Sequence, residues 1–467
     1  MHGVDDPGYS LSRPATVSLY CTYIRTLKKS PDSACRLRRA VATGDTSRMN
    51  TTNEPGATQD TAALPLAGTR VVDISNFLAA PLASMFLVDF GAEVIKVERP
   101  GVGDEVRRWG EVKNGVGLYY KAVNRGKKSI TADLRTPFGV DVVKRLVKDA
   151  DILVENYRPG TIEKWGLGPD VLREINPGLI VLRVTGFGQT GPNHKRPGFG
   201  TIAEAYAGYV HISGEPSGPP LLPGFGLADS TTGLMAAYLA SIALHEKRRS
   251  GKGQVIDLAL YETLLTLLGP QVVNYDQLGI IQERAGSRLP FTAPRNIYRT
   301  RDDKFISVGG SAQSIWERIC AALEIPEVVK DPRFADNRAR LKNVDALDDV
   351  LQAAISCFDR DELMRRFIEL EAAISPVNNV EDVIRDEHVI ARENIVSIPD
   401  AELGAPLRMQ NVVGKLSRTP GVIRHTGPRM GEHNREVLID LLGFSEEELV
   451  KHDIDPGPAR AAQAPQP

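Results

Sequence analysis

The sequence predicts an α/β fold with a mostly parallel sheet, and two observations carry that prediction. Short apolar runs of strand length alternate with helical segments from residue 66 to about residue 185. The strand-like runs are short, the first reads as buried, and their alternation with helices is expected of a sheet that is covered on both faces. We therefore expect a Rossmann-like large domain, with helices on both sides of its sheet.

The first βαβ unit of this domain is expected to begin at residue 70. Residues 70–75 read as a short buried strand, 79–90 as a helix that Gly91 ends, and 93–98 as the next strand. A right-handed crossover through the helix makes the two strands parallel.

A second series of elements follows directly. Residues 129–134 are strand-like, Thr136 is a candidate N-cap, and Pro137 suits the first position of the following helix. Further elements in the same order are a strand at 151–156, a helix at 169–175 and a strand at 178–184.

The chain divides by changes in its pattern. Residues 1–64 read as an extension that is disordered or that precedes a true start at Met49. After about Leu268, short strands mix with helices, as in a smaller α+β domain. The predicted divisions are 65–284 for the large domain, 285–385 for the small domain, 386–454 for a return to the large domain, and 455–467 for a disordered tail.

The composition is that of a water-soluble globular enzyme, with 42% hydrophobic and 25% charged residues. A net charge of −2 gives no reason to expect nucleic acid or a membrane as partner. The four cysteines include no Cys-x-x-Cys pair, so neither a disulfide framework nor a thiolate zinc site is expected. We expect a cytoplasmic protein, or a mitochondrial one if the basic N-terminal stretch is a transit peptide.

A glycine motif, Gly186-Phe-Gly-Gln-Thr-Gly191, has the spacing of a dinucleotide-binding loop. In such loops the third glycine opens a helix whose N-terminus holds a pyrophosphate. Here Pro192 follows at once, and residues 193–197 read as loop. We therefore interpret the motif as a glycine-rich turn at a strand end.

Asp229 is the candidate for chemistry, because it stands where a glycine-bearing loop turns into the helix through Met235 and Leu244. Its simplest role is that of an N-cap. A helix N-terminus can also keep a carboxylate ionised with one oxygen free. Such a carboxylate can attack a thioester and form a mixed anhydride. The local sequence leaves both roles open.

Several ordered segments resemble the class III coenzyme A transferases, chiefly between Leu66 and about Gly269. They are Asp73-Ile-Ser with Ala80-Pro81, residues 91–100, Gly103-Asp104, residues 124–129, residues 154–160 and the Asp229 segment, followed by residues 376–378 and 386–389. The resemblance implies an α/β domain with a small domain, in an interlocked homodimer. It also implies coenzyme A transfer between carboxylic acids, through an aspartyl anhydride and an aspartyl-CoA thioester on Asp229. Coenzyme A is then a substrate, with no permanently bound cofactor or metal.

The same resemblance implies a set of coenzyme A contacts. They are expected at Arg99, Ala132, Arg135, Asn156, Tyr157 and Lys164. The cations suit the nucleotide phosphates, and Tyr157 suits the adenine. Lys164 replaces an arginine of some members, which keeps the charge and loses the bidentate geometry.

The sequence also departs from the family pattern. Gly200 stands where formyl-CoA transferases carry a glutamate, and residues 286–289 replace their tetra-glycine loop, so oxalate and formate are not expected as substrates. An acyl-CoA racemase of the same fold and a non-catalytic CoA-binding protein remain alternatives, although Phe199 and Gly200 replace the racemase's second base. Candidates for lining the acyl pocket are Tyr206, Tyr209 and His211.

Overall fold

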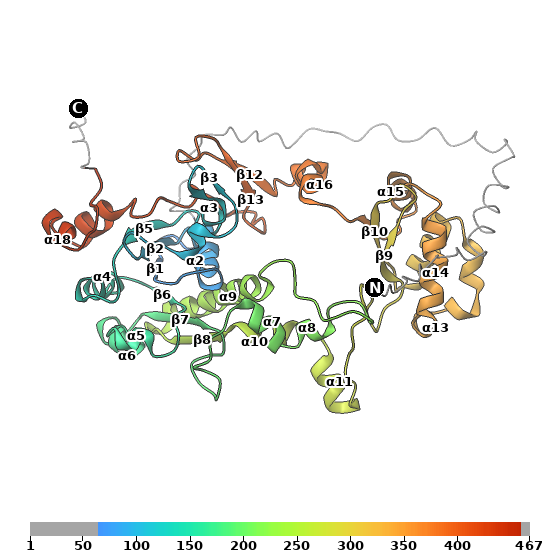
Figure 1. Ribbon diagram of the computed structural model, residues 1–467, viewed down its shortest axis with the longest axis horizontal. Coiled ribbons are helices and arrows are strands. Elements are labelled where there is room, and N and C mark those ends of the chain that lie inside the picture. Colours follow the sequence, from blue (N-terminus) through green and yellow to red (C-terminus); the bar gives the residue numbers. More distant parts are fainter. Residues whose placement is uncertain (1–63, 459–467) are drawn as a thin grey trace, which may run out of the picture. The chain divides into compact units, whose positions relative to one another are not determined.

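The computed structural model describes residues 64–458, so nearly all of the predicted N-terminal extension and residues 459–467 of the predicted tail lie outside it. The described chain forms two compact units. The smaller unit contains residues 214–218 and 285–383, and the larger unit contains 64–213, 219–284 and 384–458 (Figure 1).

Six parallel strands form the main sheet of the larger unit, in the order β5-β2-β1-β6-β7-β8. Counted along the chain, this order is 3-2-1-4-5-6, as in Rossmann folds, which confirms the predicted sheet. The strand order reverses between β1 and β6, so ligands are expected beyond their carboxyl ends. The strands are β1 (Arg70–Asp73), β2 (Glu93–Glu98), β5 (Lys128–Thr131), β6 (Ile152–Glu155), β7 (Ile180–Thr185) and β8 (Val255–Ala259).

Both faces of the sheet are buried, which explains why successive residues along its strands can both be apolar. Along β1, Val71 belongs to one core cluster and Val72 to the other, because successive side chains point to opposite faces. The first cluster includes α2 (Ala79–Asp89), α9 (Leu227–Ser250) and α10 (Leu260–Leu267). The second includes α4 (Pro137–Val147), α6 (Pro169–Ile175) and the π-helical segment η5 (Arg435–Leu441).

Two helix ends match their sequence signals. The hydroxyl oxygen of Thr136 accepts the backbone N–H of Gly139 at 3.1 Å, and Pro137 is the first residue of α4. Gly91 follows the end of α2 with φ of 104°, a left-handed conformation that favours glycine. The predicted boundaries of these helices are therefore confirmed by their capping geometry.

The larger unit also contains shorter elements. Those before the long helix α9 are η2 (Glu105–Arg108), β3 (Val112–Lys113), β4 (Val116–Gly117), α3 (Leu118–Val123), α5 (Thr161–Lys164), α7 (Gly200–Tyr206) and α8 (Tyr209–Ile212). Those after α10 are α11 (Gln271–Leu278), α17 (Glu387–Ala391), β12 (Ile395–Ile398), β13 (Leu407–Gln410) and α18 (Glu446–Lys451).

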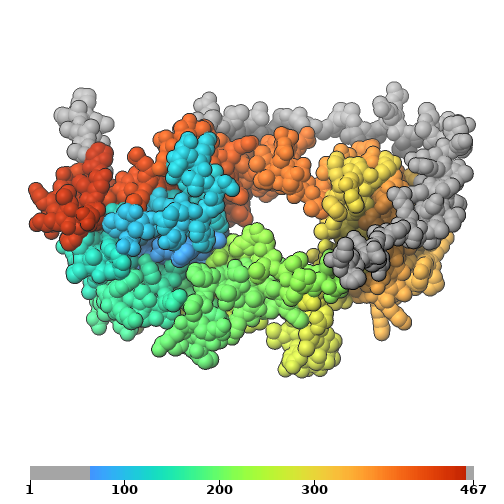
Figure 2. Space-filling model, in the orientation of Figure 1, coloured from blue at the N-terminus to red at the C-terminus, as the bar shows by residue number. Residues whose placement is uncertain are grey.

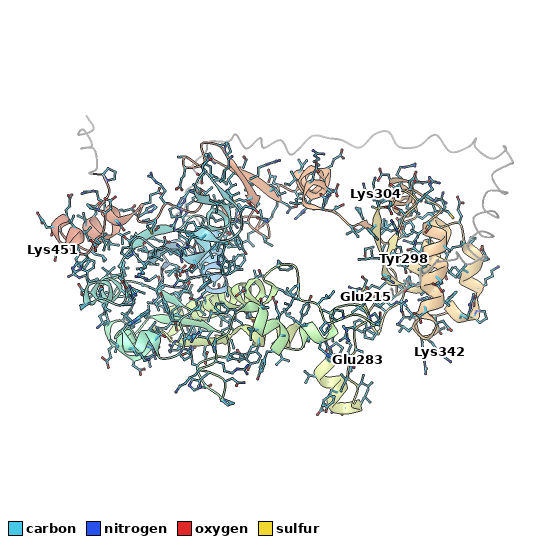
Figure 3. All side chains as sticks on the ribbon, in the orientation of Figure 1. Glu215, Glu283, Tyr298, Lys304, Lys342 and Lys451 are labelled. Atoms are coloured by element: carbon cyan, nitrogen blue, oxygen red, sulfur yellow. The ribbon has the colours of Figure 1, made fainter. Side chains whose placement is uncertain are left out.

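The smaller unit packs helices on an antiparallel sheet of three strands in the order β11-β10-β9. Its core includes Trp316 and Tyr298. The hydroxyl of Tyr298, which is labelled in Figure 3, donates to the carboxylate of Asp348. The elements are β9 (Arg295–Arg299), β10 (Phe305–Gly309), α12 (Gln313–Ala322), η3 (Pro326–Lys330), η4 (Pro332–Phe334), α13 (Asn337–Lys342), α14 (Val344–Ile355), α15 (Arg360–Glu369) and β11 (Ile374–Pro376). Helix α16 (Val380–Arg385) spans the boundary between the units along the chain.

Candidate active site

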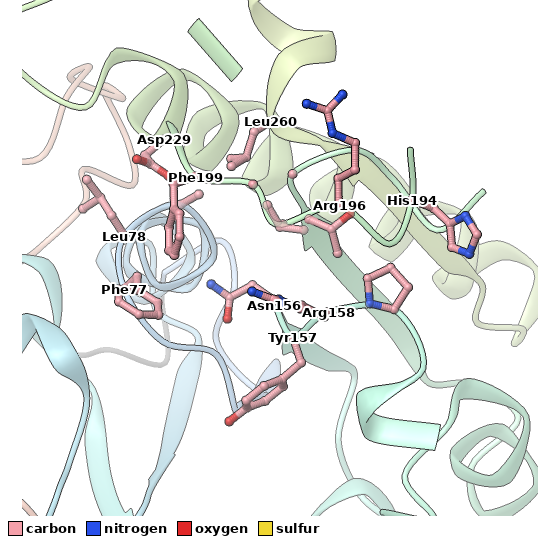
Figure 4. Close-up of a pocket in the computed structure, with 16 residues that line it drawn as sticks. Phe77, Leu78, Asn156, Tyr157, Arg158, His194, Arg196, Phe199, Asp229 and Leu260 are labelled. Carbon is pink, nitrogen blue, oxygen red and sulfur yellow. The ribbon is translucent and has the colours of Figure 1, made fainter. Parts of the chain in front are cut away.

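A cavity of about 220 Å³ lies at the carboxyl ends of the parallel strands in the larger unit. Phe77 follows β1, Asn156 follows β6, Thr185 ends β7 and Leu260 follows β8, and all four line it. Asp229 reaches the same cavity from the start of α9 (Figure 4). The cavity therefore occupies the region where this fold places its ligands.

Asp229 is the third residue of α9 and does not cap it. The capping position is Gly226, which has no side chain to offer. Instead, Glu204 of α7 accepts the backbone N–H of Ala228 at 3.1 Å. The capping role considered for Asp229 is therefore wrong, because a carboxylate 25 residues upstream fills it. Within residues 64–458, the Asp229 carboxylate has no hydrogen bond or ion pair.

The surroundings of Asp229 make its carboxylate unusually basic. Burial, together with the nearby charge of Glu204, raises its pKa to about 6. Burial and the charge of Asp229 also raise the pKa of Tyr119, which lies on α3. A carboxylate that is ionised at neutral pH yet poorly stabilised is suited to nucleophilic attack.

Two glycines give the carboxylate its space. A Cβ atom built on Gly200 would lie 2.2 Å from Asp229 Oδ2, and one built on Gly226 would lie 3.3 Å from the same oxygen. Gly200, the residue that replaces the glutamate of formyl-CoA transferases, thus lies directly against the candidate nucleophile.

A second cavity, of about 240 Å³, adjoins the first. Phe77 and Tyr157 line both cavities. Arg99, Ala132 and Arg135, which follow β2 and β5, line the second. Five of the six expected coenzyme A contacts therefore line these two cavities, since Asn156 lines the first. Lys164 is exposed on α5 and lines neither.

The two arginines of the second cavity are oriented by one carboxylate. Arg99 Nε lies 3.7 Å from Asp133 Oδ2, and the guanidinium of Arg135 donates to both oxygens of Asp133. Both arginine side chains are about half exposed. They can therefore meet the phosphates of a bound nucleotide while Asp133 holds their direction.

Asparagine side chains join the loops after β1 and β6. The backbone N–H of Asn76 donates to Asn156 Oδ1 at 2.9 Å, and Asn156 Nδ2 donates to the carbonyl of Asn76 at 2.6 Å. The side chain of Asn76 also donates to the Tyr157 hydroxyl at 3.0 Å. Asn156 and Tyr157 thus fix the switch point between the two halves of the sheet.

Sequence reasoning missed several residues that line the first cavity. Phe77, Arg158, His194 and Arg196 all line it. Phe77 has φ of 66°, and Asp104 Oδ1 accepts its backbone N–H at 3.0 Å. The only sequence signal that could have identified Phe77 and Arg158 is their position after predicted strands, at the carboxyl edge of the sheet. Tyr206, Tyr209 and His211 do not line this cavity.

The glycine motif at residues 186–191 serves close packing of the backbone. A Cβ atom on Gly186 would lie 2.6 Å from the Cα atom of Gly198, and the reverse contact is equally short. Gly186 and Gly198 both line the cavity of Asp229. No helix begins at Gly191, as the interpretation of a glycine-rich turn requires.

Within the described part of the chain, no group of three His, Cys, Asp or Glu side chains could hold a metal ion. Of the two cysteines in that part, Cys320 is buried, and Cys357 Sγ donates to the carbonyl of Ala353 at 3.5 Å.

Comparison with known proteins places this geometry in a family. The model of CoA-transferase family III matches residues 66–434. The succinyl-CoA–D-citramalate CoA-transferase of Chloroflexus aurantiacus is 45% identical over 386 residues, which cover 82% of this chain and 96% of that protein. The beta subunit of succinyl-CoA–L-malate CoA-transferase from the same organism is 41% identical over 392 residues, or 83% and 97% of the two chains.

A solved structure agrees with the sequence relatives. The crystal structure of a CAIB/BAIF family protein from Brucella suis superposes with a TM-score of 0.73 at 34% identity, covering 81% of this chain and all of that one. The resemblance noted in the sequence is thereby confirmed, and the protein acts as an enzyme on CoA thioesters and carboxylic acids. The chain belongs to CoA-transferase family III.

Proposed function

We propose that this enzyme moves coenzyme A from succinyl-CoA to a short dicarboxylic acid, with Asp229 as the covalent nucleophile. The observation that carries the proposal is the state of Asp229: its carboxylate lines the cavity, caps nothing and has a raised pKa. The adjoining cavity supplies Arg99 and Arg135 for the nucleotide phosphates.

The first half of the reaction transfers the acyl group and then coenzyme A to Asp229. A carboxylate oxygen of Asp229 attacks the thioester carbonyl, and the C–S bond breaks. The CoA thiolate departs, and the product on Asp229 is an aspartyl succinyl anhydride. The thiolate then attacks the aspartyl carbonyl of this anhydride. Succinate departs with the electron pair of the broken C–O bond, and aspartyl-CoA thioester remains.

The second half reverses these steps with the acceptor. The acceptor carboxylate attacks the aspartyl carbonyl and expels the CoA thiolate, which gives a new anhydride. The thiolate attacks the acceptor carbonyl, forms the acceptor thioester, and restores the Asp229 carboxylate. No net proton is gained or lost, so a second base is not required.

Two observations support dicarboxylic acids as the substrate class. The names of the two relatives above pair succinyl-CoA with citramalate or malate, both short hydroxy dicarboxylic acids. In this chain, the cavity of Asp229 is also lined by Arg158, His194 and Arg196, whose side chains can meet a second carboxylate.

A transfer assay tests the proposal. The enzyme is mixed with succinyl-CoA and separately with L-malate, D-citramalate, glutarate or acetate, and new thioesters are separated by chromatography. We expect thioesters of the dicarboxylic acids, little from acetate, and none with Asp229→Ala. Epimerisation of an α-methyl acyl-CoA without an acceptor would instead support a racemase. Binding of coenzyme A without either reaction would support a non-catalytic protein.

We also infer that two copies of the chain associate as a homodimer. Leu234, Tyr238 and Ile242 lie four residues apart along α9, so they form one apolar stripe, and each is about half exposed. Helix α11 exposes Val272, Val273 and other large apolar side chains, and protrudes from the larger unit in Figure 2. Light scattering should give about twice the 50.9 kDa of one chain. Replacement of Leu234 by Glu should reduce that mass, whereas Glu at the exposed Lys451 should not.

A further inference from the structure

Helix α7 presents two residues to the start of α9. Gly200 and Glu204 are four residues apart and therefore lie on the same side of α7. Asp229 occupies the space that a side chain at position 200 would need, with its Oδ2 2.2 Å from the ideal Cβ site. The position of the Asp229 carboxylate thus depends on its contact with α7, a helix that precedes it in the sequence.

Glu204 is buried, with only 2% of its surface exposed, although it carries an ionisable group. Its Oε1 accepts the N–H of Ala228, the residue directly before Asp229, and Ala228 is fully buried. Because Gly226 cannot cap α9 with a side chain, this bond satisfies one N–H of its first turn. Burial of an acidic side chain is costly, so a second role for its charge is worth testing.

We propose that Glu204 is a positioning residue for the nucleophile, one that both fixes the first turn of α9 and destabilises the ionised form of Asp229. The inference rests on the proposed function, because it assigns Glu204 a part in the reactivity of Asp229. When Asp229 attacks the thioester, its negative charge passes to the departing CoA thiolate and the anhydride is neutral. Repulsion between the two carboxylates is therefore present before acylation and relieved by it.

The other ionisable groups near Asp229 come from three further segments. They are Tyr119 on α3, Tyr157 and Arg158 after β6, and His194 and Arg196 in the loop before α7. The pKa of the Asp229 carboxylate is raised by burial first and by the charge of Glu204 second. Removal of the Glu204 charge should therefore lower the pKa of Asp229.

The test compares two substitutions at the same position. Glu204→Gln keeps an oxygen that can accept the Ala228 N–H and removes the charge, whereas Glu204→Leu removes both. For Glu204→Gln we expect the acidic limb of kcat/KM to move to lower pH by roughly one unit. We expect Glu204→Leu to be less active than Glu204→Gln and to unfold at a lower temperature, because the first turn of α9 loses its cap.

Glu448 provides a matched control. It also accepts a backbone N–H at the start of a helix, that of Ser445 at 2.7 Å, but it lies on α18. Glu448→Gln should leave the pH profile unchanged. An acidic limb of Glu204→Gln that superimposes on that of the unmodified enzyme would overturn the inference and leave Glu204 as a cap only.

A second measurement separates this inference from the proposed function. Succinyl-CoA is added in the presence of hydroxylamine, and the labelling rate of Asp229 is followed against pH by mass spectrometry. It reports on Asp229 even if a variant does not turn over. If Glu204→Gln leaves the pH dependence of labelling unchanged, the proposed role of Glu204 is contradicted, and the proposed function is not. If Asp229 of the unmodified enzyme is never labelled, the proposed function fails and this inference fails with it.

Discussion

Two aspartates in the larger unit show how the surroundings of a carboxylate decide its role. Asp73, at the end of β1, is fully buried and held by Ser75 Oγ at 2.5 Å, Ser84 Oγ at 2.6 Å and Lys127 Nζ at 3.0 Å. Burial opposes its ionisation, but the charge of Lys127 and these hydroxyls outweigh burial and hold its pKa well below the usual range.

Asp229 has the opposite surroundings. Glycines and another carboxylate, that of Glu204, are its neighbours, and its pKa is raised. Asp73 is therefore a structural ion, whereas Asp229, the proposed nucleophile, is held in an ionised state that costs stability. We propose that Asp229 is reactive because its carboxylate lacks the hydrogen-bond and ion-pair partners that Asp73 has. The following predictions test that contrast.

Removal of the Asp229 carboxylate should have the largest effect. We expect Asp229→Asn to lower the rate of coenzyme A transfer by roughly four orders of magnitude, because an amide cannot form the anhydride. The initial rate of new thioester formation measures this loss. Asp141→Asn, on the exposed pair with Arg145, serves as the control and should retain full activity.

The same change at Asp73 should act on stability. Asp73→Asn leaves Lys127 charged and buried without its partner, so we expect a loss of about 3 to 5 kcal/mol in the free energy of unfolding. Urea denaturation followed by circular dichroism measures it. The exposed Asp141→Asn should cost less than about 1 kcal/mol. Equal losses for the two variants would contradict the structural role of Asp73.

At Asp229 the stability effect should have the reverse sign. A folded-state pKa of about 6 lies above the ordinary value of 3.8, so stability is full below 3.8, falls as the pH rises from 3.8 to about 6, and is constant above that. Asp229→Asn should therefore stabilise the protein by about 3 kcal/mol at pH 7.5, and change its stability little at pH 4. Urea midpoints at the two pH values measure the difference. Destabilisation by Asn at pH 7.5 would mean that the carboxylate is well satisfied.

The smallest expected effect concerns the space around Asp229. A methyl group at position 200 would displace the carboxylate, so Gly200→Ala should lower kcat about tenfold to a hundredfold with the fold intact. Steady-state kinetics measure the change. Gly224→Ala is the control, because its Cβ would meet no atom within 4 Å and its φ is not left-handed. Equal kcat values for the two variants would show that Asp229 tolerates displacement.

The sheet could be predicted from the sequence because its signals are local. Short apolar strands, the cap at Thr136 and the glycine after α2 each act within a few residues, and each has its expected place. The position of Arg99, Ala132 and Asn156 at strand ends also brought them to one edge of the sheet.

Parts of the candidate site could not be predicted, because they depend on contacts between distant segments. Glu204 accepts the backbone N–H of Ala228, the residue before Asp229. No local sequence pattern distinguishes this arrangement from one in which Asp229 itself caps the helix. The left-handed turn at Phe77 depends on Asp104, 27 residues away. Lys164, which the family resemblance implies as a contact, lines neither cavity.

The central claim is that Asp229 becomes covalently modified during transfer. The enzyme is incubated with succinyl-CoA, trapped with hydroxylamine, digested, and mapped by tandem mass spectrometry. We expect an aspartyl hydroxamate at Asp229, formed only when succinyl-CoA is present, and none at the exposed Asp141. Coenzyme A transfer that proceeds at full rate without modification of Asp229 would contradict it.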